Sequence, residues 1–189
     1  LDCPYELYWF KKSADDANDK RAGMGTFGRY SCSGVADSYI DVTPSMKVIF
    51  YVVPAYQAGG SDVAVQSEVT KTKTAAQEIV DKNYTSDYAR LRGYMEAICN
   101  LVSYNDAAAK DDWTEGYGNP WQLIWVFDGD ETTNVVCEGY AKAFQYLCDL
   151  SAFYDAACYT VTGMMGSGNH MWNIVTLKGK NYLVDVTNC

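Results

Sequence analysis

Histidine is almost missing from this chain, which has one copy, His170, in 189 residues. Its seven cysteines include no pair separated by two residues. The Cys/His patterns that bind zinc are therefore absent, and we expect neither a metal site nor a cofactor. The cysteine count is odd, so full oxidation would leave at least one thiol unpaired. The sequence alone leaves the redox compartment open.

The chain also lacks a basic run, a heptad array and any apolar stretch long enough to span a bilayer. Its formal net charge is -9, which disfavours nucleic acid or an anionic membrane surface as the main partner. We therefore expect no nucleic-acid binding and no transmembrane segment. Because the chain starts at Leu1 rather than at Met, we expect a mature or trimmed form. Nothing in the sequence indicates the oligomeric state.

Aromatic residues are abundant instead, with sixteen tyrosines and five tryptophans. Residues 1–70 carry aromatic and β-branched runs and predict a β-rich accessory portion. From about Val69 the apolar residues take helical spacing. Residues 71–189 then predict two helices, a polar loop, a central helix and three antiparallel strands. The second helix should start at a cap formed by Ser86 and Asp87, and its apolar stripe comprises Tyr88, Leu91, Met95, Ile98, Cys99 and Val102. This order predicts an α+β fold with two parts, residues 1–70 and residues 71–189.

The central helix is predicted in "NVVCEGYAKAFQYLC", residues 134–148. Thr132, Thr133 and Asn134 are good N-cap residues, so Cys137 should lie in the first turn. Unpaired N–H groups and the helix dipole can stabilise a thiolate there and receive an oxyanion. Gly139 should keep the surface near the sulfur open. The helix alone leaves a packed thiol as the alternative. One apolar stripe joins Cys137, Tyr140, Ala141, Phe144, Leu147 and Cys148.

His170 is the one side chain whose ordinary pKa suits proton transfer near neutrality. It follows the loop "GSGN" and opens the strand "MWNIV". Trp172, two residues later, should share its face of the strand and line a cleft. By itself a lone histidine at a strand start is commonly incidental.

Asp185 lies within the apolar run "YLVDVT", where a charged side chain needs a partner. A hairpin over residues 178–181, centred on Gly179 and Lys180, would place it opposite Ile174, near the His170 end of the preceding strand. An aspartate there can orient an imidazole. Alone, Asp185 also fits a strand-end or salt-bridge carboxylate.

Together, "VVCEGYAKAFQYLCDL", "NHMWNIV" and "YLVDVTN" resemble the core motifs of the transglutaminase-like superfamily, a papain-related group. The resemblance covers about residues 85–189. It implies Cys137 as nucleophile, His170 as general base and acid, and Asp185 as the orienting residue. It also implies a thioester acyl-enzyme formed from an amide. Because such a core normally has further strands, we expect the natural chain to continue past Cys189.

The resemblance further implies an oxyanion-stabilising side chain upstream of the nucleophile. "WTEGYG" favours Trp113, and Gln122 is the second candidate. Trp121 could line the cleft. The two tryptophans fit equally well as loop anchors.

The predicted function is cysteine-dependent acyl transfer on amide bonds, most concretely a peptidase or amidase acting on peptide, protein or cell-wall peptide substrates. The resemblance favours a bacterial protein that is secreted or attached to the cell wall, and an extracellular or cell-surface location, with the cytoplasm as the alternative. Two alternatives stay open for function. A primary amine in place of water would make the enzyme a protein-crosslinking transglutaminase. The same fold could instead serve as a non-catalytic cell-surface binding module.

Overall fold

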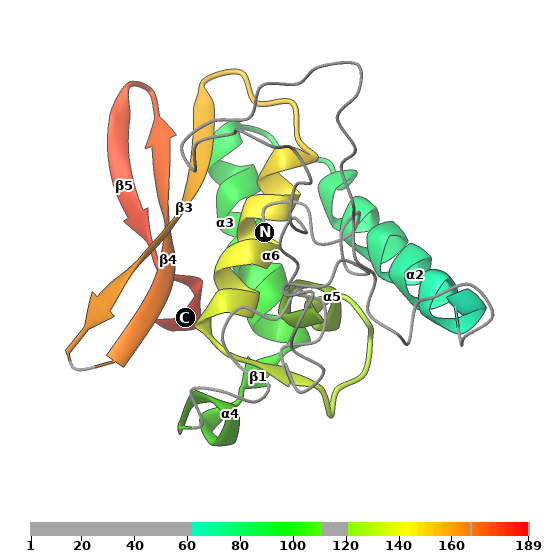
Figure 1. Ribbon diagram of the computed structural model, residues 1–189. Helices are drawn as coiled ribbons and strands as arrows, with labels where there is room; N and C mark the ends of the chain where they lie inside the picture. Colours follow the sequence, from blue (N-terminus) through cyan, green and yellow to red (C-terminus); the bar gives the residue numbers. More distant parts are fainter. Residues whose placement is uncertain (1–61, 111–120, 167, 189) are drawn as a thin grey trace, which may run out of the picture.

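The computed structural model describes residues 62–110, 121–166 and 168–188. Five helices, two short paired strands and a three-stranded sheet make up this part (Figure 1). In chain order the elements are α2 (Asp62–Val80), α3 (Asp87–Leu101), β1 (Ser103–Tyr104), α4 (Asp106–Lys110), α5 (Trp121–Val126), β2 (Asn134–Val135), α6 (Cys137–Asp149), β3 (Ala156–Met165), β4 (Gly168–Leu177), β5 (Lys180–Val184) and the short 3-10 helix η2 (Val186–Asn188).

Helix α6 runs through the middle of the core (Figure 1). It contacts α3 and α5 on one side and strands β3 and β4 on the other. All six residues of the predicted apolar stripe are buried, which confirms that prediction. Glu138, Gly139 and Ala143 are buried as well. The helix is thus covered around most of its circumference, as expected for an element between two layers.

The three predicted C-terminal strands form an antiparallel sheet in the order β3-β4-β5. His170 of β4 lies opposite Gly163 of β3. Strands β4 and β5 are joined by Lys178 and Gly179, whose φ angles are 52° and 71°. Positive φ at both central residues defines a tight turn that suits the twist of a hairpin.

This turn corrects the predicted hairpin register. The turn centres on Lys178 and Gly179 rather than on Gly179 and Lys180, and Ile174 pairs with Leu183. Asp185 is therefore not opposite Ile174. It lies two residues further along, closer to the start of β4 and to His170.

Helix α3 begins where the sequence predicted, because the Ser86 hydroxyl oxygen accepts a hydrogen bond from the Ala89 N–H at 3.1 Å. Its buried face differs from the predicted stripe: Tyr94 is fully buried, whereas Tyr88 is 62% exposed. Tyr94 packs inward because its hydroxyl has a partner there, the Ser151 hydroxyl at 2.6 Å.

Helix α2 begins at Asp62, before the change of spacing predicted near Val69. Residues 1–61 lie outside the described part, so the division of the chain at residue 70 stays a prediction. None of the helices that the structure describes combines the length and apolarity needed to cross a bilayer.

Candidate active site

Cys137 is the first residue of α6, which confirms its predicted place in the first helical turn. The predicted cap is wrong. Val136 is the N-cap, and no side chain caps the helix from that position. Asn134 belongs to β2, and the Thr132 hydroxyl donates to Asp130 Oδ1 instead. Pairing of β2 with β1 holds this segment extended up to the residue before the helix.

Gln122 of α5 supplies the missing support for the start of α6. Its Oε1 accepts a hydrogen bond from the Val136 N–H at 2.8 Å, and its side chain is 1% exposed. The residue thus fixes the segment directly before Cys137. This contact gives Gln122 a positioning role, and the oxyanion role stays a prediction.

Gly139 has a packing role that differs from the expected one. A Cβ at this residue would lie 2.6 Å from Cβ of Val135 and 2.9 Å from the carbonyl oxygen of Gln122. Gly139 is itself buried. Its missing side chain therefore lets α6 approach β2 and α5 closely, rather than opening the surface near the sulfur.

The Cys137 thiol is buried, with 4% of the residue exposed. Burial raises its pKa above the ordinary value, and the carboxylates of Glu138 and Asp185 raise it further. The backbone N–H groups of Met171 and Glu138 lower the pKa without reversing the rise. The helix terminus thus acts as expected, but desolvation outweighs it, and the resting thiol holds its proton at neutral pH.

The buried carboxylate beside the nucleophile belongs to Glu138, whose side chain is 2% exposed. It forms an ion pair with Lys142 one turn later along α6. A buried carboxylate needs such a cation, because desolvation would otherwise make its charged form costly. The sequence pattern alone did not indicate this ion pair.

His170 and Asp185 form the predicted pair. Nε2 of His170 lies 2.8 Å from Oδ2 of Asp185, and both side chains are about nine-tenths buried. The carboxylate also accepts from the side-chain amide of Asn188 at 2.6 Å and the backbone N–H of Thr187 at 3.3 Å. These donors hold the carboxylate in place, and the carboxylate holds the imidazole.

The pair lies next to Cys137. The Cys137 thiol interacts with the N–H of Met171, the residue after His170, and with the carboxylate of Asp185. Trp172 stacks on the imidazole, with ring centroids 5.8 Å apart at 22°. Its ring also covers Gly163, where a Cβ would lie 2.6 Å from the indole. The predicted shared face of His170 and Trp172 is therefore present, while the cleft-lining role of Trp172 stays a prediction.

Asn173 fastens the strand that carries His170 to the helix that carries Cys137. Its Nδ2 donates to the Ala141 carbonyl oxygen at 3.0 Å and to the Thr160 hydroxyl at 3.2 Å. Asn173 is fully buried. Removal of this amide would loosen helix α6 from the sheet, so Asn173 supports the distance between nucleophile and base.

Tyr104 is a site residue that sequence analysis did not select. Burial raises the pKa of its phenol, with further rises from Cys137, Asp106 and Asp185, and the Cys137 backbone N–H opposes them. Its hydroxyl therefore lies close to the nucleophile. The signal was the segment "CNLVSYND", which resembles the helix and tyrosine that commonly precede such a core, but the resemblance was not used to give Tyr104 a role.

Trp113 and the side chain of Trp121 lie outside the described part of the chain. The oxyanion role of Trp113 and the cleft-lining role of Trp121 therefore stay predictions. Cys137, Cys148 and Cys158 are free thiols, and Cys99 is disulfide-bonded. Within residues 62–110, 121–166 and 168–188, no group of three or more His, Cys, Asp and Glu side chains could hold a metal ion.

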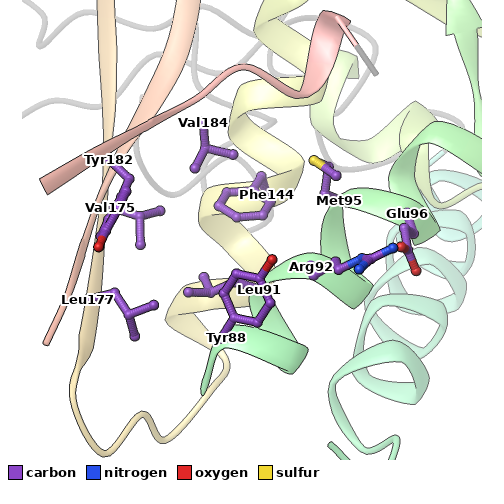
Figure 2. A pocket seen from close by; sticks show the side chains of 10 residues that line it. All are labelled: Tyr88, Leu91, Arg92, Met95, Glu96, Phe144, Val175, Leu177, Tyr182 and Val184. Carbon is purple, nitrogen blue, oxygen red and sulfur yellow. The ribbon is translucent and has the colours of Figure 1, made fainter. Parts of the chain in front are cut away.

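A separate cavity of about 470 Å³ lies between α3, α6 and strands β4 and β5 (Figure 2). Apolar side chains line most of it, and the exposed Arg92–Glu96 ion pair lies at its edge. Val175 and Leu177 border it from the C-terminal half of β4, whereas His170 lies near the start of that strand. None of Cys137, His170 and Asp185 lines this cavity, so it is separate from the candidate catalytic residues.

No family model matches the chain. Over 136 residues the chain is 29% identical to the Kyphoscoliosis peptidase of Homo sapiens, and the match covers 64% of this chain and 19% of that protein. The Kyphoscoliosis peptidase of Mus musculus is 28% identical over 139 residues, with coverage of 66% and 19%. The chain thus spans about a fifth of the length of these relatives.

A solved structure described as the crystal structure of a TGase is 13% identical, with a TM-score of 0.49. The match covers 69% of this chain and 34% of that chain. The described core is an α+β arrangement in which a Cys-bearing helix packs on an antiparallel sheet that bears the histidine. Asp185 follows directly after the last strand. This architecture agrees with the transglutaminase-like core predicted from the motifs.

Proposed function

We propose that this chain is a cysteine-dependent acyl-transfer enzyme of the transglutaminase-like superfamily, with Cys137 as nucleophile, His170 as general base and acid, and Asp185 as the orienting residue. The observation that carries the proposal is the buried 2.8 Å contact between His170 and Asp185 beside the first residue of α6. Distant similarity to peptidase-named proteins supports the same class of chemistry.

The roles follow from the atoms involved. Asp185 occupies Nε2 of His170, which leaves Nδ1 to exchange protons with the thiol. Because the resting thiol keeps its proton, His170 removes it as sulfur attacks the amide carbonyl carbon. The C–N bond then breaks, and the imidazolium gives its proton to the leaving amine. Attack on the thioester by water or by an amine, with His170 again as base, regenerates the thiol.

We propose peptide or protein amides as the substrate class. Hydrolysis by a peptidase or amidase is the favoured reaction, because water is always available to attack the thioester. Crosslinking requires the same thioester and a primary amine in place of water. The similar proteins are mammalian and called peptidases. The bacterial cell-wall hypothesis therefore draws no support from them, whereas a peptide substrate does.

An extracellular or cell-surface location is part of the proposal. The disulfide at Cys99 supports it, since disulfides persist mainly in oxidising compartments. Thiol counting on protein purified under non-reducing conditions would test it, and a fully reduced chain would argue for the cytoplasm.

The enzymatic proposal is tested by trapping the acyl-enzyme. The protein is incubated with glutamine-containing peptides, with and without a primary amine, and analysed by intact-mass and peptide-level mass spectrometry. We expect a thioester on Cys137, a hydrolysed product without amine, and a conjugate where amine transfer occurs. Cys137→Ala should abolish the adduct, and Cys148→Ala, which removes another buried thiol, should keep it. Absence of any acyl adduct, together with ordinary thiol reactivity unaffected by His170→Ala, would favour a non-catalytic binding module.

A further inference from the structure

Strand β5 forms an open edge of the C-terminal sheet. It pairs with β4 on one side, and none of the other described strands pairs with it on the other side (Figure 1). The two-residue turn makes Leu177 and Lys180 a hydrogen-bonded pair, and such pairs alternate with non-bonded pairs along an antiparallel ladder. Asn181 and Leu183 are therefore the residues of β5 whose backbone N–H and C=O groups point away from β4.

The opposite edge of the sheet is partly covered. By the same alternation, Cys158 of β3 points its backbone groups away from β4. Its carbonyl oxygen accepts a hydrogen bond from Nε2 of Gln145, on the helix α6 that packs against β3 and β4. In β5, by contrast, four of the five residues are exposed, including Tyr182 at 48% and Leu183 at 67%. These two side chains lie on opposite faces of the strand, and an exposed apolar edge of this kind favours pairing with another strand.

The apolar cavity of about 470 Å³ lies along the same strand. Tyr182 and Val184 line it from β5, and Met95 with its neighbours on α3 lines it from the opposite side (Figure 2). Tyr182 is half exposed although it borders this space, so the helices leave β5 incompletely covered. Side chains alternate between the two faces of a strand. A strand added at the edge of β5 would therefore direct every second side chain toward the cavity and α3.

The lining of the cavity disfavours a charged occupant. Arg92 and Glu96 are the charged residues among the described ones that line it, and they form an ion pair with each other at 2.7 Å. The other lining residues are apolar or are tyrosines. A charged group that entered would lose water without finding an unpaired partner of opposite charge. We therefore expect uncharged side chains at the positions of an added strand that face α3.

We propose that the outer edge of β5 and the adjoining cavity form a binding site for an extended segment of a partner protein, with uncharged apolar side chains at alternate positions. The backbone of this segment would exchange hydrogen bonds with Asn181 and Leu183, and its apolar side chains would lie beside Met95 and Tyr182. A small molecule in the cavity would leave the backbone groups of β5 unpaired, so the open edge favours a peptide. The site is separate from Cys137, and the inference does not depend on the proposed function.

The test uses the full chain and a fluorescein-labelled peptide of alternating valine and threonine, capped at both ends. Fluorescence anisotropy measures the dissociation constant. We expect saturable binding, and binding weaker by about ten-fold or more when aspartate or lysine replaces valine. Amide hydrogen exchange followed by mass spectrometry should slow in β5, and not in β3, when the peptide is bound. Absence of saturable binding up to about 1 mM peptide would overturn the inference.

Two pairs of variants test the edge and the cavity separately. Leu183→Pro removes an outward N–H and keeps the ladder to β4, and Met164→Pro does the same at the outer edge of β3, at a residue that is 61% exposed. We expect the first to weaken binding by about ten-fold or more and the second to leave it within about two-fold. Met95→Gln makes the cavity more polar, whereas Leu101→Gln alters an exposed leucine of α3 that does not line it. The first should weaken binding by about three- to ten-fold, and the second should not change it.

Other occupants would give different results. If Met95→Gln weakens binding and a folded Leu183→Pro variant binds normally, side chains enter the cavity without strand pairing, and the inference fails. If the β5 amides are already protected from exchange in the free protein, another segment of the polypeptide covers the edge. If that protection rises with protein concentration, a second copy of the chain covers it. Either form of protection would also overturn the inference.

Discussion

Nε2 of His170 lies 2.8 Å from Oδ2 of Asp185, which follows it by fifteen positions along strand β4, a two-residue turn and strand β5. The length of the turn determines which residue contacts His170, because a hairpin one residue longer would place a different residue next to the imidazole. A short structural motif near the C-terminus thus fixes one nitrogen of the candidate base. The other nitrogen is left for the nucleophile.

Asp185→Asn tests the orienting role directly. Asparagine keeps the size of the side chain but removes the charge that stabilises an imidazolium, and its amide can favour the other tautomer. We expect kcat to fall by about 10²- to 10⁴-fold with a small change in KM. Steady-state kinetics on the peptide substrate measures the effect. Asp155→Asn, at an exposed carboxylate, should leave kcat unchanged. Wild-type kinetics in Asp185→Asn would remove Asp185 from the mechanism.

The ionisation of Cys137 should depend on Glu138. A thiol becomes negative when it ionises, so burial and a nearby carboxylate both raise its pKa. The rate of Cys137 alkylation should therefore reach its midpoint above the ordinary value of about 8.5 for a cysteine thiol. Glu138→Gln removes one negative charge, which should move the midpoint to lower pH.

The measurement is the iodoacetamide rate at Cys137 by mass spectrometry over the neutral and alkaline range. Glu96→Gln alters an exposed carboxylate of α3 that pairs with Arg92, so it serves as the matched control and should not move the midpoint. A midpoint well below that of an ordinary thiol in the wild type would show that the helix terminus and His170 outweigh burial.

Sequence patterns predicted the parts of this fold that depend on local chemistry. The apolar stripe of α6, the Ser86 cap of α3 and the three C-terminal strands all follow from residue spacing and are present. The pairing of His170 with Asp185 was also predicted, although the hairpin register was wrong by two residues. That register depended on Lys178 adopting positive φ, which is uncommon for a residue with a side chain and so was not expected.

The support around Cys137 was not predictable in the same way. Gln122, Gly139 and Tyr104 act through contacts between elements that are distant in sequence, and each has an ordinary local explanation. From the sequence alone, Gln122 is expected to be an amide at the end of a loop, and Gly139 a small residue at the surface. Their roles become visible when α5, β1 and β2 meet at the first turn of α6.

Gln122→Met distinguishes a positioning residue from an oxyanion donor. Methionine has a similar volume but no acceptor, so the buried Val136 N–H would lose its partner. We expect the free energy of unfolding to fall by about 1–3 kcal/mol. Urea denaturation measures stability, and iodoacetamide labelling of Cys137 should also change because the start of α6 loosens. Gln77→Met, at an amide that bonds to the exposed Asp81, should change little. A variant with native stability and normal labelling, but slow acylation, would instead assign the oxyanion role to Gln122.

Gly139→Ala tests whether close packing holds the nucleophile in place. The added methyl group would lie 2.6 Å from Cβ of Val135 and 2.9 Å from the backbone oxygen of Gln122, and neither atom belongs to the end of a flexible side chain. We expect a loss of about 1–3 kcal/mol in the free energy of unfolding, because α6 must move away from β2 and α5.

Since Gly139 follows Cys137 by two residues, the same movement should lower kcat at temperatures where the variant is still folded. The matched control is Gly168→Ala: Gly168 is exposed, and the nearest atom to its added methyl group would be 3.9 Å away. This control should stay within about 0.5 kcal/mol of wild type. Equal stability of the two variants by urea denaturation would mean that α6 has room at Gly139, and that the position of Cys137 does not depend on contact with β2.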